Sequence, residues 1–280
     1  MTEWRKAIPE ERDRRQSQAI AWGVGVVLAL AAAAPLLAAW KLRLPRWPLT
    51  MPIVFSAGFA VLAWRFRAAT AAGAAMGGLV CFLLAQSPDF WARYVPLPSP
   101  HAPLWALVAV VVLTFAATKF GRAKKEARGL AEERRGRRAS QVAANLGVAA
   151  IFAAAGGFGG AVAALAEATA DTVSSEIGQA VGGQAVLLTT RRPVTAGTDG
   201  GVSLAGTVAG VLGAAVIVGI GGWHHAWPEK TAVMIAACAG LFFDSLLGAT
   251  AERRGWIGND VVNLASTLFS ALLAEALVRR

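Results

Sequence analysis

Acidic residues stand inside two segments that are otherwise apolar enough to cross a lipid bilayer. Asp171 lies within the alanine-rich run 161–182, and Asp244 lies within the apolar run 231–250. A charged side chain at membrane depth costs at least about 2.5–3.5 kcal/mol on insertion scales, so it usually serves a function and faces a partner. Carboxylates suit Mg²⁺, a hard cation that completes its shell with water and phosphate oxygens. We therefore expect Asp171 and Asp244 to be catalytic and to bind a magnesium ion.

Hydroxyl groups, further acids and glycines accompany these two residues at helical spacing. Glu167, Asp171, Ser175 and Gly178 are three or four residues apart, so a helix would place them on one face. Asp244 begins a similar sequence of acid, hydroxyl and glycine. The predicted phosphate-binding residues of the two segments are Thr172, Ser175, Glu176 and Ser245. A polar helix face that only packs against other helices is the alternative interpretation.

A third group of polar residues occurs in the C-terminal part of the chain. Asn259, Asp260 and Asn263 begin a polar stripe that continues along the predicted helix 261–278. Such stripes often only hold membrane helices together, at about 0.6 kcal/mol per contact, and a charged residue exceeds that need. We predict that Asp260 is catalytic and that the two asparagines complete the site or orient the acceptor.

A glycine-rich sequence, Gly197-Thr198-Asp199-Gly200-Gly201, precedes the predicted helix 202–222. Successive backbone N–H groups in such a loop bind anions, and the dipole of the following helix adds to the attraction. The predicted phosphate-binding residues here are Arg191, Thr198, Asp199, Gly200, Gly201 and Ser203. A capped junction between loop and helix explains the pattern equally well. The chain lacks the GxxxxGK[ST] sequence of a P-loop.

The composition indicates an integral membrane protein. Of the 280 residues 56% are hydrophobic and 16% are charged, against roughly 25% charged in soluble domains, and the mean hydropathy is +0.52. A soluble protein of this composition would have to hide several helices that are apolar all round. The net charge of +10 does not indicate a nucleic-acid partner, because the basic residues gather beside the apolar segments.

The apolar segments predict an all-α, polytopic membrane helix bundle with about nine (seven to nine) transmembrane helices, some short or broken at glycines. We expect a tail at 1–18 and one transmembrane domain at 19–280, without a cleavable signal peptide. The sequence is divided at Gly156–Gly160 because four glycines in five residues make a poor helix interior. The expected helices are 19–40, 49–64, 68–86, 103–118, 142–155, 161–182, 202–222, 231–250 and 261–278.

Lysine and arginine residues predict the orientation. Residues 119–138 hold nine basic and three acidic residues, which by the positive-inside rule indicates a cytoplasmic loop. Alternation then places the basic N-terminal tail, the basic loop at 119–141 and the Gly-rich loop at 183–201 in the cytoplasm of a protein of the cell membrane. Lys119, Asn145 and the other candidate site residues gather in the cytoplasmic half. We therefore expect a cleft that opens to the cytoplasm.

Seven short sequences together resemble an integral membrane family that includes plant phytyl-phosphate kinase and animal transmembrane protein 19 and is described as domain of unknown function 92. They cover roughly residues 60–278. They are Thr118-Lys119, Gln141-Val142 with Asn145, Ala170-Asp171-Thr172 with Ser175-Glu176-Ile177-Gly178, Leu188-Thr189-Thr190, Gly197-Thr198 with Gly200-Gly201-Val202-Ser203, Asp244-Ser245-Leu246-Leu247-Gly248-Ala249, and Asn259-Asp260 with Val262-Asn263-Leu264. The chain departs from the family at Arg191, which replaces a glycine, and at Asp199, which replaces an asparagine.

The resemblance implies an NTP-dependent enzyme, a kinase or a related nucleotidyltransferase, that acts on a prenyl-alcohol monophosphate. With Mg²⁺ bound, Lys119, Asn145, Arg191 and the Gly-rich loop would hold phosphates of the lipid and of ATP or CTP. The expected partners are thus the lipid bilayer, an isoprenoid lipid phosphate and a nucleotide, with no nucleic acid.

Two other functions remain open on the sequence. Acids inside the membrane next to Gly-interrupted helices are also typical of secondary transporters and ion-coupled carriers. A scaffold that has lost its activity is the remaining alternative.

Overall fold

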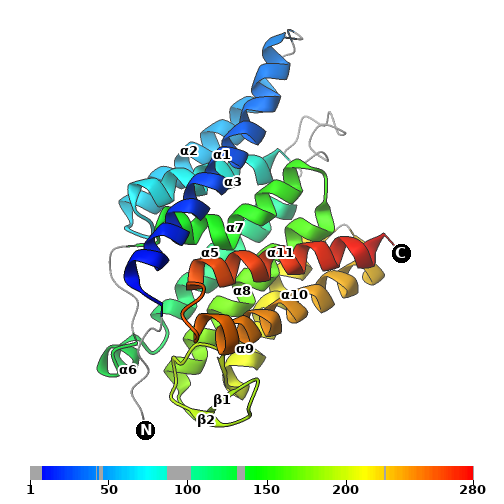
Figure 1. Ribbon diagram of the computed structural model, residues 1–280. Coiled ribbons are helices and arrows are strands. Elements are labelled where there is room, and N and C mark those ends of the chain that lie inside the picture. Colours follow the sequence, from blue (N-terminus) through cyan, green and yellow to red (C-terminus); the bar gives the residue numbers. More distant parts are fainter. Residues whose placement is uncertain are drawn as a thin grey trace.

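The computed structural model describes residues 8–41, 43, 47–86, 102–130, 136–223 and 225–279. The chain is a helix bundle with one small sheet (Figure 1). The helices are α1 (Glu10–Lys41), α2 (Trp47–Arg65), α3 (Ala71–Ala85), α5 (Ala102–Lys119), α6 (Arg122–Ala127), α7 (Ala139–Ala154), α8 (Phe158–Val181), α9 (Leu204–Gly221), α10 (Trp227–Leu247) and α11 (Asn259–Val278), and a π-helical turn, η1 (Gly248–Glu252), continues α10. Each of the nine helices predicted from the sequence has a counterpart.

The bundle has the lengths and the surface of a multi-pass membrane protein. Among the residues that the structure describes, four helical segments are long and apolar enough to cross a bilayer, namely Glu10–Ala38, Leu204–Gly221, Trp227–Glu252 and Asn259–Val278. Shorter apolar helices stand beside them, including α3 and α7. Large apolar side chains such as Trp22 and Leu204 are exposed, as a lipid-facing surface requires. The predicted polytopic membrane bundle is confirmed.

Helix α8 lies at the centre of the bundle and packs against α5, α7, α9, α10 and α11. Several of its polar residues, among them Glu167 and Thr172, are therefore buried inside the bundle. Helix α9 approaches most closely: a Cβ atom on Gly210 would lie 2.6 Å from the carbonyl oxygen of Ala170 in α8. Small residues allow such close contact between membrane helices.

The expected division between α7 and α8 is confirmed. Helix α7 ends at Ala154, Gly156 has a positive φ of 79°, and α8 begins at Phe158. The ring of Phe152 leaves no space for a side chain at Gly160. The glycines therefore allow the chain to reverse direction tightly.

Three elements differ from the expectation at one end of the bundle. Helix α1 begins at Glu10 instead of residue 19, because its first turns bind the α10–α11 connection: Arg12 Nη1 donates to Gly255 O at 2.9 Å. The loop expected at 119–141 contains α6. The loop expected at 183–201 contains antiparallel strands β1 (Ala185–Leu187) and β2 (Pro193–Val194), and β1 also pairs with β3 (Gly201–Val202). In Figure 1, β1, β2 and α6 lie at the same end of the molecule.

Candidate functional site

A cavity of about 260 Å³ lies between the cytoplasmic loops of the predicted topology and helices α7, α8, α9, α10 and α11. Its lining brings together segments separated by more than 100 residues. The predicted site residues that line it are Asn145, Asp171, Thr172, Ser175, Glu176, Thr198, Asp199, Gly200, Gly201, Ser203, Asp244, Ser245, Asn259 and Asn263.

The two principal acids enter the cavity from different helices. Asp171 projects from α8 and Asp244 from α10, and their carboxyl groups are close enough to interact electrostatically, as Asp244 also does with Glu167 and Glu252. Ser266 Oγ of α11 donates to Asp244 Oδ2 at 3.2 Å. Acids this close repel one another unless a cation or a proton lies between them.

An amide network joins α7 to α11 along another wall. Asn263 Nδ2 donates to Asn145 Oδ1 at 3.4 Å, and Asn145 Nδ2 donates to the carbonyl oxygen of Gln141 at 2.9 Å. Thr267 Oγ1 donates to Ala144 O at 3.1 Å, which ties the same two helices together. The network places amide groups beside the acids in a fixed geometry.

The Gly-rich loop forms a further wall, and part of its sequence is explained by packing. Gly200 has a φ of 70°, and the backbone of Ala249 in η1 occupies the space that a side chain there would need. A Cβ atom on Gly248 would in turn lie 2.7 Å from Gly200 N. Ser203 Oγ accepts from Gly206 N at 3.2 Å and so caps α9. Close packing and capping therefore operate in this loop, which still borders the cavity.

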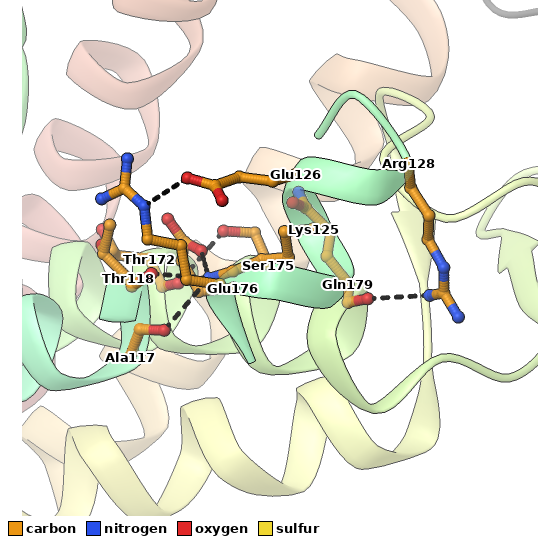
Figure 2. Close-up of polar contacts among 10 residues, drawn as sticks. Ala117, Thr118, Lys125, Glu126, Arg128, Thr172, Ser175, Glu176 and Gln179 are labelled. Atoms are coloured by element: carbon orange, nitrogen blue, oxygen red, sulfur yellow. Dashed lines mark hydrogen bonds and ion pairs between the residues drawn. The ribbon is translucent and has the colours of Figure 1, made fainter. Parts of the chain in front are cut away.

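Glu176 lines the cavity and is also held by a buried lysine. Lys125 of α6 is 1% exposed, and its Nζ donates to Glu176 Oε2 and, at 2.8 Å, to Thr118 O. Figure 2 shows Lys125 pointing from α6 toward Glu176 on α8, while Arg128 reaches Gln179 O at 3.1 Å. These contacts fasten α6 to the C-terminal end of α8.

Three of the predicted site residues lie outside the cavity. Asp260 is 4% exposed and accepts from Ser17 Oγ of α1 at 2.7 Å, because it lies one residue round α11 from Asn259. Lys119 is exposed, with Nζ 4.5 Å from the ring centroid of Phe115. Arg191 is exposed in the turn between β1 and β2. The structure does not bring these side chains to the other candidates.

Several cavity residues were missed by the reasoning from sequence. Arg137 is the only lysine, arginine or histidine that lines the cavity in the described part of the chain. It was read only as part of the basic loop that indicates orientation. Gln179, Thr207 and Glu252 were also missed, whereas Gln141 belongs to a motif of the family resemblance and Ser174 to the polar helix face, although neither was predicted as a site residue. Gln141 and Ser174 lie next to predicted residues at helical spacing, and that spacing was the available signal.

The donor atoms fit a hard divalent cation that is bound jointly with a ligand. Among the described residues there is no group of three or more His, Cys, Asp and Glu side chains arranged to hold a metal. The protein would instead supply Asp171 and Asp244, with amide and hydroxyl oxygens nearby. Mg²⁺ usually takes only one or two protein carboxylates and obtains its other oxygens from water and phosphates.

The fold and the cavity define a class of protein: a multi-pass membrane protein with an acidic site enclosed by its helices. More particularly, the chain belongs to the family described as Integral membrane protein DUF92, whose family model matches residues 54–271. The match includes the cavity-lining segments from α7 to α11.

Curated relatives from three organisms are similar to this chain. Uncharacterized membrane protein sll0875 of Synechocystis sp. is 34% identical over 194 residues, which are 61% of this chain and 75% of the relative. Protein VTE6, chloroplastic, of Arabidopsis thaliana is 33% identical over 186 residues, 60% of this chain and 56% of that protein. Uncharacterized membrane protein MJ0933 of Methanocaldococcus jannaschii is 34% identical over 175 residues, 60% of this chain and 72% of the relative. No solved structure gives a significant match.

Proposed function

We propose that this protein is a Mg²⁺-dependent phosphotransferase of the membrane that converts a prenyl monophosphate to a diphosphate with ATP or CTP. One observation carries the proposal: Asp171 and Asp244, which are distant in sequence, meet in one polar cavity within a membrane helix bundle. The ordered motifs that resemble the phytyl-phosphate kinase family support the same reaction, and most of their polar residues line this cavity.

The reaction needs positioning and charge neutralisation more than covalent chemistry by the protein. An oxygen of the prenyl monophosphate attacks the γ-phosphorus of the nucleotide, the bond from that phosphorus to the β-γ bridging oxygen breaks, and the products are a prenyl diphosphate and a nucleoside diphosphate. Asp171 and Asp244 would hold Mg²⁺, which neutralises and aligns phosphate oxygens when bound. The amides of Asn145 and Asn263 and the hydroxyl of Ser175 would orient the reacting phosphates by hydrogen bonds.

The lipid chain would leave the cavity between α9 and α10. Thr207 of α9 and Phe242 of α10 both line the cavity, and Phe242 is also 41% exposed on the apolar outer surface. Leu204 and Val208 of α9 are exposed beside Thr207 in sequence. A phosphate in the cavity and an isoprenoid chain passing Phe242 into the bilayer would satisfy the polar and apolar parts of one substrate.

An assay with purified protein tests the proposal. The protein in detergent is supplied with MgCl₂, ATP or CTP, and farnesyl or phytyl monophosphate, and the diphosphate is measured. We expect Asp171→Asn and Asp244→Asn to reduce turnover by at least about 100-fold, because each would remove a metal ligand. Arg191→Ala, in an exposed turn outside the cavity, is the matched control and should retain activity. No diphosphate from the unaltered protein, or full activity of Asp171→Asn, would refute the proposal.

One observation favours a second candidate, an ion-coupled carrier. Glu167 is 1% exposed on α8, one helical turn from Asp171, and within the described residues its Oε1 atom has no hydrogen-bond partner. Buried acids of this kind serve proton and ion pathways in transporters. Accumulation of a substrate in proteoliposomes that depends on a proton or sodium gradient, and on Glu167, would favour the carrier.

A further inference from the structure

The backbone of Arg137 is held on both sides by the turn that joins α2 to α3. Arg137 N donates to Ala68 O at 2.9 Å, and Arg137 O accepts from Thr70 N at 3.0 Å, in a parallel bridge with Ala69. This bridge ties Arg137, two residues before the start of α7, to a segment almost 70 positions earlier. Both polar groups of the Arg137 backbone are therefore fixed by hydrogen bonds.

Two glycines make this arrangement possible. Arg137 O lies where a side chain at Gly73 would have to stand, so any larger residue there would displace it. Gly136 has a φ of 77°, and a Cβ atom on it would lie 2.6 Å from Arg67 O. The position of Arg137 thus depends on close backbone contacts. These contacts do not involve its side chain.

Arg137 lines a cavity whose other charged lining residues are acidic. The carboxylates that line it belong to Asp171, Glu176, Asp199, Asp244 and Glu252. In the described lining, Arg137 is the single basic side chain, and it lies close enough to Asp171 to interact electrostatically. Lys125 neutralises Glu176 from outside the lining. A phosphate that enters the cavity therefore meets an arginine whose backbone is fixed and whose charge acts on the predicted metal ligand Asp171.

We propose that Arg137 is the side chain that binds the phosphate group of the substrate, a role for which the sequence had favoured Lys119 and Arg191. This inference rests on the proposed function in its choice of substrate, a phosphate monoester. Arginine suits the task because its planar guanidinium donates two parallel hydrogen bonds to phosphate oxygens. Asp171, a predicted magnesium ligand, lies close enough to Arg137 that both would act on the same phosphate group.

Direct binding measurements test this role without relying on turnover. Calorimetry on the detergent-solubilised protein with Mg²⁺ would titrate farnesyl monophosphate without nucleotide and, separately, the non-hydrolysable nucleotide AMP-PNP without lipid. We expect Arg137→Gln to weaken the affinity for farnesyl monophosphate by about 10- to 100-fold. Arg137→Lys keeps the charge but loses the parallel hydrogen bonds. Its affinity for farnesyl monophosphate should lie between those of the unaltered protein and Arg137→Gln. Loss confined to AMP-PNP would mean that Arg137 binds the nucleotide instead of the phosphate monoester, and would overturn the proposal.

Arg138→Gln is the matched control, because Arg138 is exposed and does not line the cavity. It should bind both probes as the unaltered protein does. The unfolding temperature without ligand is measured for every variant, and if Arg137→Gln does not fold, Arg137→Lys decides. A lower unfolding temperature with unchanged affinity for both probes would mean that Arg137 only pairs with Asp171, and would overturn the proposal.

The outcomes also separate this inference from the proposed function. Phosphate binding that depends on Arg137, without formation of a diphosphate, would support the inference and refute the kinase. Diphosphate formation by the unaltered protein, together with unchanged affinity in Arg137→Gln, would support the kinase and overturn the inference. An unaltered protein that binds neither probe would overturn the inference.

Discussion

At the scale of single residues, the cavity is notable for how its charges are distributed. Several carboxylates line it together with one basic residue, Arg137. A second basic residue, Lys125, pairs with Glu176 from the buried interface with α6. A buried charge is costly unless it is paired, so each partner of the Lys125–Glu176 pair depends on the other. The pair fixes α6 against the C-terminal part of α8.

Removal of one member of this pair should therefore destabilise the protein. We expect Lys125→Met to lower the free energy of unfolding by about 3–5 kcal/mol, since Glu176 would be left as a buried unpaired charge. The double variant Lys125→Met with Glu176→Gln should recover most of that loss. Denaturation in detergent, followed by circular dichroism, measures both.

The exposed pair between Arg122 and Glu126 of the same helix serves as the control. Arg122→Met should cost at most about 0.5 kcal/mol. An equal cost for Lys125→Met and Arg122→Met would contradict the view that burial makes the Lys125 pair important.

At the scale of elements, glycines set the distance between α8 and α9. The backbone of α9 approaches α8 at Gly206 and Gly210, and the approach carries Ser203 and Thr207 to the cavity. Gly219, near the other end of α9, has no atom within 4 Å of the position of a Cβ. The same helix thus contains glycines with and without a packing role.

This difference gives a matched pair of substitutions. Gly210→Ala should destabilise the protein by about 1–3 kcal/mol, because the new methyl group would collide with Ala170 O and force the helices apart. Gly219→Ala should be neutral or stabilising by up to about 1 kcal/mol, since alanine is the better helix former. Thermal unfolding in detergent compares them, and a greater loss for Gly219→Ala would show that the α8–α9 contact is wrongly described.

At the scale of the whole molecule, the α1 helix and the small sheet frame the end where the cavity lies. Helix α1 contacts the α10–α11 connection through Arg12 and Gln16, and it contacts α11 itself through Ser17. The family match begins only at residue 54, within α2, so these contacts come from a part of the chain outside the matched region. The predicted topology places this end in the cytoplasm.

Cysteine labelling tests that topology. In a variant with Cys81 and Cys238 replaced by alanine, Arg191→Cys should react with a membrane-impermeant maleimide only after cells are permeabilised. Trp227→Cys, at the start of α10 and 78% exposed, should react in intact cells. Both positions are exposed, so each controls for the reactivity of the other. The opposite pattern of labelling would reverse the predicted orientation.

The helices could be predicted from the sequence because hydropathy and glycine breaks are local. The meeting of Asp171 with Asp244 was also expected, since both stand in apolar segments and must face a partner. Arg137 was missed because its place depends on the bridge to Ala69, which no local pattern reveals. Asp260 was misplaced because neighbouring residues of a helix point about 100° apart, so that Asn259 faces the cavity while Asp260 faces Ser17.

The contact between Gly200 and η1 joins two walls of the cavity, the Gly-rich loop and the end of α10. Main chain touches main chain there, without intervening side chains that could rearrange and absorb a displacement. Asp244 lies only one helical turn before Gly248, so the Gly-rich loop packs directly beside the helix end that carries this acid. Packing at Gly200 therefore contributes to the position of the helix end that carries Asp244, and a side chain at Gly200 would displace both segments.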